Sequence, residues 1–211
     1  YSATVAANAT IAGAGNKNTA KLVYNEKDST KEETTTYVWK LNVHKYALDS
    51  TNHEVALSGA KFVLYRMDNG VKKYAKLTNK KIVGWVTDKD NATTLETSGT
   101  GDILIEGLNV GTYYLEETEA PVGYNKLTEP IEVEITATTS VTSGSETVQY
   151  KNSSETSYTP ATDATVKVLN NAGTQLPSTG GIGTTIFYVI GGVLMAVAAV
   201  LLVTKKRMNN K

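Results

Sequence analysis

The chain has 211 residues, which is enough for one domain of ordinary size and additional segments. Lysine plus arginine equals aspartate plus glutamate at 21 each, so no charge excess points to nucleic acid as a partner. The lack of cysteine excludes disulfides, thiolate metal sites and a cysteine nucleophile.

The N-terminal part of the sequence differs in residue pattern from the rest of the chain. No signal-type sequence precedes Tyr1, and the chain reads as the C-terminal part of a longer protein. Residues 1–27 contain two strand-like segments, "YSATVAANATIAGAG" and "KLVYN", followed by the polar run "NEKDSTKEETTT". We expect residues 1–27 to be the end of a preceding domain and residues 28–35 to be a linker.

Residues 36–172 are rich in Thr, Val, Tyr and Ile, and apolar and polar residues alternate between turn signals. The clearest strand-like segments are "YVWKLNVHKY", "AKFVLYR", "DILIEGL", "TYYLEE", "IEVEI" and "ATVKVLN". Many short strands with little helix predict an all-β domain with an immunoglobulin-like β-sandwich.

Three polar residues stand where the next apolar residue of a strand face is expected. They are Lys45, Glu117 and Asn170, at the ends of "WKLNVHK", "YYLEE" and "VKVLN". Each could lie at a strand end, where the face meets water, because buried charged residues are costly unless paired. A Lys–Glu salt bridge is a second explanation, and it leaves the asparagine unexplained.

A third explanation is chemical. Apolar burial disfavours the charged forms of lysine and glutamate, and a neutral lysine amine is a nucleophile. A protonated Glu117 could donate a hydrogen bond to the side-chain carbonyl of Asn170 and transfer protons. Attack by Lys45 on that carbonyl, with loss of ammonia, would crosslink the first and last strands by an isopeptide bond. Such a bond would replace the missing disulfides.

The two histidines, His44 and His53, are nine residues apart and predict no metal site. No phosphate-binding loop, nucleophile elbow or paired-carboxylate cleft is recognisable in the sequence. We therefore expect neither a metal nor another cofactor.

The C-terminal part combines three features in order. "LPSTG" lies within a Gly/Pro/Thr-rich linker at 173–185, a charge-free apolar run follows at 186–203, and a basic tail occupies 204–211. An uninterrupted apolar run of this length predicts a transmembrane helix. The basic tail predicts a cytoplasmic end, so that the rest of the precursor lies outside the plasma membrane.

These motifs resemble those of one protein family. "YYLEETEAPVGY" is similar to the E-box of Gram-positive pilins, whose catalytic glutamate corresponds to Glu117. "LNVHKY" and "VKVLNN" resemble the lysine and asparagine motifs of the first and last strands, and parity favours Asn170 over Asn171. "LPSTG", the apolar run and the basic tail resemble the sortase cell-wall sorting signal.

The chain from about residue 36 to residue 211 therefore resembles the C-terminal region of an LPXTG-anchored major (backbone) pilin with a CnaB-type isopeptide domain. The resemblance implies a structural subunit of a sortase-assembled pilus on the cell surface, not an enzyme that turns over. It implies Glu117 as proton shuttle for a Lys45–Asn170 crosslink. It also implies Asn25 as the crosslink asparagine of the preceding domain.

By the same resemblance, sortase would recognise the pentapeptide and cleave the Thr179–Gly180 bond. Thr179 would then be joined to a lysine of a neighbouring pilin subunit or to peptidoglycan. The recognised residues are Leu176, Pro177, Ser178, Thr179 and Gly180.

Two other functions share this sorting signal. One is a non-polymerised wall-anchored adhesin whose ligand-binding head lies upstream, which would add host surface ligands as partners. The other is a wall-anchored hydrolase whose catalytic domain lies upstream. No "YPK"-like lysine motif occurs in the sequence, so we expect the acceptor lysine to lie outside it.

Overall fold

A computed structural model describes residues 6, 8–25, 27–152, 155–173, 194–195 and 205. The chain divides into two units, Tyr1–Gly173 and Thr174–Lys211. The sorting motif at 176–180 lies outside the described residues, as do the segments at 186–203 and 204–211 except for residues 194, 195 and 205. Among the described residues, no helix has the length and apolar character needed to cross a membrane.

The first unit is built from strands. A single turn of 3-10 helix, η1 (Lys89–Asn91), interrupts them in the described residues. The strands are β1 (Asn16–Ala20), β2 (Val23–Tyr24), β3 (Lys27–Asp28), β4 (Glu32–Thr36), β5 (Trp39–Leu48), β6 (Glu54–Ala56), β7 (Lys61–Asp68), β8 (Val71–Thr78), β9 (Lys81–Val86), β10 (Leu95–Glu96), β11 (Asp102–Leu108), β12 (Gly111–Glu119), β13 (Ile131–Thr139), β14 (Gly144–Asn152), β15 (Thr159–Pro160) and β16 (Thr165–Leu169).

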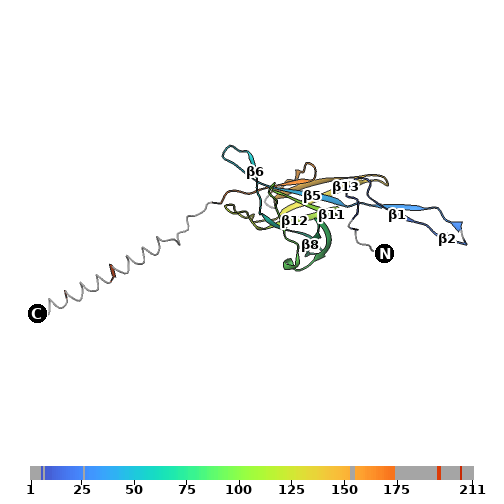
Figure 1. Ribbon diagram of the computed structural model, residues 1–211, viewed down its shortest axis with the longest axis horizontal. Coiled ribbons are helices and arrows are strands. Elements are labelled where there is room, and N and C mark those ends of the chain that lie inside the picture. The colour runs from blue at the N-terminus through green and yellow to red at the C-terminus, as the bar shows by residue number, and fades with distance from the viewer. Residues whose placement is uncertain are drawn as a thin grey trace. The chain divides into compact units, whose positions relative to one another are not determined.

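Most of these strands form one continuous hydrogen-bonded path, which Figure 1 shows folded into a single body. The order is β15-β14-β13-β12-β7-β8-β9-β11-β5-β16, with β6 added to β5 and β10 added to β7. The neighbours β5 and β16 run parallel, so the first and last strands of this body lie side by side. The predicted all-β sandwich is confirmed.

The core lies between the inward faces of these strands. Alternate residues of β5 are buried from Trp39 to Ala47, as expected for a strand with one face against a core. The same period-two pattern continues along β12, β13 and β16. The core residues contributed by these four strands are Trp39, Leu41, Val43, Tyr113, Leu115, Ile131, Val133, Ile135, Val166 and Val168.

The N-terminal segment forms a two-stranded ribbon that projects from this body (Figure 1). β1 pairs with β4 in antiparallel register from Asn16↔Thr36 to Ala20↔Glu32. The predicted linker at 28–35 therefore contains most of a paired strand instead of forming a free connection. The reason is local, because the threonines of "EETTT" favour extended backbone and β1 offers them a partner edge. The assignment of residues 1–27 to a preceding domain stays a prediction.

Candidate functional site

The three polar residues singled out from the sequence meet inside the core. Lys45 lies on β5, Glu117 lies on β12, and Asn170 directly follows β16. Their exposed fractions are 0%, 2% and 1%. The explanation that they mark strand ends in water is therefore wrong. β12 is not adjacent to β5 or β16 in the sheet order, so Glu117 reaches the other two side chains across the core.

Backbone pairing places the lysine and the asparagine close together. In the parallel register, Lys45 is opposite Val168. The N–H of Asn170 donates to the carbonyl oxygen of Tyr46 at 2.9 Å and so extends the pairing by one position beyond β16. Both side chains consequently point inward at the same level of the sandwich.

The side-chain atoms form a compact network. Lys45 Nζ donates to Asn170 Oδ1 at 2.5 Å, which is shorter than an ordinary N–H···O bond. The same Nζ lies 3.1 Å from Glu117 Oε1. Asn170 Nδ2 donates to that same oxygen at 3.2 Å. A single carboxylate oxygen therefore contacts both the amine and the amide nitrogen.

Burial changes the acid–base chemistry of the lysine. Desolvation lowers the pKa of Lys45 from its ordinary value of 10.5 to about 8, and the nearby Glu117 carboxylate opposes this shift. The ring of Phe62 lies 5.5 Å from Nζ and contributes an apolar wall with a weak cation–π contact. A lysine with a lowered pKa is more readily converted to the neutral, nucleophilic amine.

The arrangement differs in one respect from the sequence prediction. The sequence reasoning directed Glu117 at the carbonyl oxygen of Asn170. In the structure, Glu117 contacts the amide nitrogen, which is the group that would leave, and Lys45 contacts the carbonyl oxygen. A simple Lys–Glu salt bridge accounts for one of these contacts and leaves the asparagine contacts unexplained.

The other predicted site residues lie elsewhere. Asn171 is exposed, and its backbone carbonyl accepts a hydrogen bond from the N–H of Asn125. Asn25 is exposed between β2 and β3 with a φ of 49° and is not part of the buried network. A crosslink from Asn25 to an upstream lysine stays a prediction.

One contact to the buried network was not predicted from the sequence. The backbone N–H of Leu127 donates to Glu117 Oε2 at 2.7 Å. Leu127 belongs to the connection between β12 and β13, and its side chain packs against the core. The E-box-like motif ends three residues earlier, at Tyr124, so nothing in that pattern marks Leu127.

Neither histidine belongs to a metal site in the described part of the chain. His44 Nδ1 lies within hydrogen-bonding distance, 2.6 Å, of Asp102 Oδ1 on the outer face of β5 and β11. The described residues contain no group of three His, Cys, Asp or Glu side chains that could hold a metal ion.

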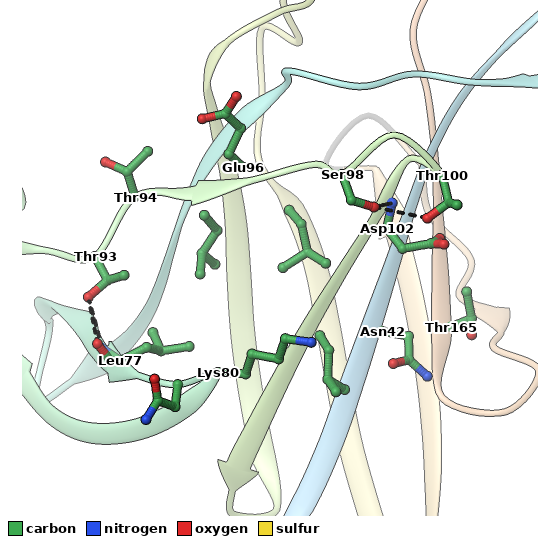
Figure 2. A pocket seen from close by; sticks show the side chains of 14 residues that line it. Asn42, Leu77, Lys80, Thr93, Thr94, Glu96, Ser98, Thr100, Asp102 and Thr165 are labelled. Atoms are coloured by element: carbon green, nitrogen blue, oxygen red, sulfur yellow. Dashed lines mark hydrogen bonds between the residues drawn. The ribbon is translucent and has the colours of Figure 1, made fainter.

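An open cleft of about 740 Å³ lies apart from the buried network, between β11 and residues 93–98 (Figure 2). Figure 2 shows its walls carrying short polar side chains, among them Ser98 paired with Thr100. Lys45, Glu117 and Asn170 do not line it. The cleft is therefore not part of the candidate site.

Two protein-family models match this chain. The family described as SpaA, a prealbumin-like fold domain, matches residues 39–147, and the LPXTG cell wall anchor motif matches residues 169–210. The first match contains Lys45 and Glu117, and the second contains Asn170 and the pentapeptide. No curated protein sequence matches the chain.

Pilins are among the solved structures that match this chain. The pilus 2b backbone protein of group B streptococcus is 27% identical over 77% of this chain and 52% of its own, with a TM-score of 0.46. The major pilin RrgB of Streptococcus pneumoniae is 22% identical over 70% of this chain and 32% of its own, with a TM-score of 0.44. The chain thus spans about half the length of the former and a third of the latter.

Proposed function

The chain belongs to the SpaA family of prealbumin-like fold domains and carries an LPXTG cell wall anchor motif, and from this premise we propose that it is a structural subunit of a sortase-assembled pilus. The anchor motif supports a place on the cell wall. The β-domain has a structural role in this proposal. The one reaction proposed for it is the formation of a crosslink between two of its own side chains. The protein is therefore a substrate of sortase and not an enzyme that turns over.

The observation that supports the proposed crosslink is the buried network of Lys45, Glu117 and Asn170. Glu117 Oε1 first takes a proton from the Lys45 ammonium, 3.1 Å away, which leaves a neutral amine. The amine then attacks Cγ of Asn170, whose carbonyl oxygen already contacts Nζ at 2.5 Å. The surrounding core excludes water that would compete for the same carbon.

The protons and bonds balance within the three side chains. Oε1 passes its proton to Nδ2, 3.2 Å away, so that the Cγ–Nδ2 bond breaks and ammonia leaves. The new Nζ–Cγ bond is an amide, and the second proton lost by Nζ returns to Oε1. Glu117 ends as a neutral acid, and the departing ammonia can take up its proton.

The C-terminal part of the chain supports the assembly step. Sortase would cleave between Thr179 and Gly180 and hold Thr179 as an acyl-enzyme. A lysine of a neighbouring pilin subunit would release it and lengthen the fibre, or an amine of peptidoglycan would release it and anchor the fibre.

Intact mass spectrometry of residues 1–173 tests the crosslink. We expect the protein to be lighter than its sequence by one ammonia. Lys45→Ala, Glu117→Ala and Asn170→Ala should each restore the full mass. Lys167→Ala is the matched control, because Lys167 lies on β16 but is exposed and paired with Glu54. A wild-type protein of full mass would refute the bond.

Polymerisation needs a separate test in a Gram-positive host that expresses the full-length protein and its sortase. Wall extracts should give a ladder of high-mass species on a denaturing gel, and Thr179→Ala should remove it. A single monomeric wall-linked band would contradict the pilus shaft and favour a non-polymerised, wall-anchored surface protein.

A further inference from the structure

The connection between β12 and β13 contacts the buried network at Glu117. Glu117 lies near the end of β12, and Leu127 follows ten positions later. The Leu127 N–H donates to Oε2, whereas Lys45 and Asn170 contact Oε1. The two carboxylate oxygens therefore have separate partners, one a backbone donor and the other the reacting groups.

The same connection also holds the chain just beyond the reactive asparagine. The N–H of Asn125 donates to the carbonyl oxygen of Asn171 at 3.0 Å, and the N–H of Gly173 donates to the carbonyl oxygen of Gly123 at 2.8 Å. Tyr124 and Ala172 form an isolated antiparallel bridge between these bonds. These contacts tie the segment that follows β16 to the segment that carries Leu127.

The packing at this junction is close. A Cβ atom added to Gly173 would lie 3.0 Å from Asn125 Oδ1 and 3.4 Å from the Gly123 carbonyl oxygen. Gly123 has a φ of 89°, a conformation that L side chains rarely adopt. The path of the connection is therefore fixed between its contacts to residues 171–173 and the Leu127 bond to Glu117.

We propose that residues 121–127 form a positioning clamp, in which the Leu127 N–H occupies Glu117 Oε2 and thereby reserves Oε1 for proton transfer. An N–H donor is best accepted by the oxygen that carries no proton. When Glu117 is protonated, its proton is consequently directed to Oε1, between Lys45 and Asn170. Leu127 is a positioning residue in this scheme, and the inference rests on the crosslink proposed above.

Two substitutions separate the backbone N–H from the side chain. Leu127→Pro removes the donor, whereas Leu127→Ala keeps the donor and removes most of the side-chain packing. Each protein, as residues 1–173, would be recovered unfolded from inclusion bodies and diluted from denaturant to start folding. Intact mass followed over time then gives the rate at which ammonia is lost.

We expect Leu127→Pro to crosslink about 10- to 100-fold more slowly than wild type, the effect of losing one hydrogen bond to a charged group. Leu127→Ala should crosslink within about threefold of wild type. The acid limb of the rate–pH profile should move to higher pH in Leu127→Pro alone, because the N–H favours the carboxylate form. A purely structural role for Leu127 would slow both variants without moving the profile.

Equal rates and equal pH profiles for wild type and Leu127→Pro would overturn the clamp and leave the crosslink intact. Failure of wild type to lose ammonia would overturn the crosslink itself, so the two failures are distinguishable. Equal slowing of both variants would also reject the role of the N–H.

A second measurement covers the case in which Leu127→Pro does not fold. In the uncrosslinked Asn170→Ala protein, hydrogen exchange of the Leu127 amide should be slow. In Asn170→Ala/Glu117→Ala it should be at least tenfold faster, while the Tyr46–Leu57 region of the sheet keeps its protection. Unchanged protection of the Leu127 amide would show that Glu117 does not accept from it.

Discussion

Lys45 is fully enclosed by the core, and its amine has both a carboxylate and an amide oxygen within contact distance. A buried lysine with such partners either stays an ion pair or reacts. The close approach of Asn170 distinguishes this network from an ordinary buried salt bridge. The proposed crosslinking chemistry depends on how easily Lys45 loses its proton.

The pH dependence of stability follows from that lysine in a variant that cannot crosslink. In Asn170→Ala, Lys45 keeps a free amine. In the folded, uncrosslinked protein, desolvation by burial lowers the pKa of this amine to about 8 from its ordinary value of 10.5. Between these values the unfolded chain binds the additional proton. Unfolding free energy should therefore rise with pH from about 8 to 10.5, by up to about 1.4 kcal/mol per pH unit.

Urea unfolding at pH 7, 8.5 and 10 measures this slope. The double variant Lys45→Met/Asn170→Ala is the control, because it keeps every other titrating group and should lack the rise. Parallel curves across the whole range would show that the Lys45 pKa is not lowered.

At the scale of elements, the N-terminal ribbon is held at its base by aromatic packing. Tyr37 and Trp39 stack with ring centroids 5.7 Å apart, and the Tyr37 hydroxyl donates to the carbonyl oxygen of Ser140. Gly144 lies against these rings, at the start of β14. An isolated two-stranded ribbon is marginally stable in water, so this attachment matters for its order.

A side chain at Gly144 should disrupt that attachment. An added Cβ would lie 2.8 Å from the Tyr37 ring and 2.9 Å from Trp39, both closer than van der Waals contact. We expect Gly144→Ala to lower unfolding free energy by about 1–3 kcal/mol, as overpacking does. Denaturant unfolding in the uncrosslinked Asn170→Ala background measures it.

Gly84→Ala provides the matched control for this substitution. Gly84 also lies in a strand, β9, but no atom lies within 4 Å of an added Cβ. Its replacement should be neutral or slightly stabilising, because alanine loses less backbone entropy than glycine on folding. Similar destabilisation at both positions would argue against a specific role for the aromatic base of the ribbon.

At the scale of the whole molecule, the proposed crosslink would close almost all of the β-body. Lys45 and Asn170 are 125 positions apart in sequence. Lys45 lies on β5, and Asn170 directly follows β16, the parallel neighbour of β5. A pulling force applied along the chain would enter and leave near these two strands. A covalent bond between them would bear a load that otherwise falls on the hydrogen bonds of the β5–β16 pair.

The same bond should stabilise the folded protein against chemical unfolding. Closing a loop of this length in the unfolded chain lowers its entropy by an amount equivalent to about 5 kcal/mol on the account used for disulfides. We therefore expect guanidinium unfolding of wild-type residues 1–173 at markedly higher concentration than of Asn170→Ala. Reducing agent should have no effect on wild type. Equal midpoints for the two proteins would contradict a stabilising crosslink.

Much of this architecture was predictable from the sequence because strand periodicity is a local signal. Alternation along "WKLNVHK", "YYLEE" and "VKVLN" identified the strand faces, and parity placed Lys45, Glu117 and Asn170 inside. The β-sandwich and family resemblance are confirmed. The covalent bond and polymerisation through Thr179 stay predictions, and the sorting motif lies outside the described residues.

Strand periodicity in the sequence predicted that Lys45, Glu117 and Asn170 extend inward-facing strand faces, while a strand end in water and a salt bridge stayed open as explanations. Their residue types suggested a crosslinking reaction. Three contacts become visible only in the folded protein: β4 pairs with β1, Glu117 contacts the amide nitrogen of Asn170, and the Leu127 N–H donates to Oε2. The physical reason is that side-chain direction is set by a two-residue repeat along one strand. Backbone partners and atomic orientation depend on segments that are distant in sequence and come together only on folding. Every residue except proline has a backbone N–H, so the sequence does not show which N–H will contact Glu117.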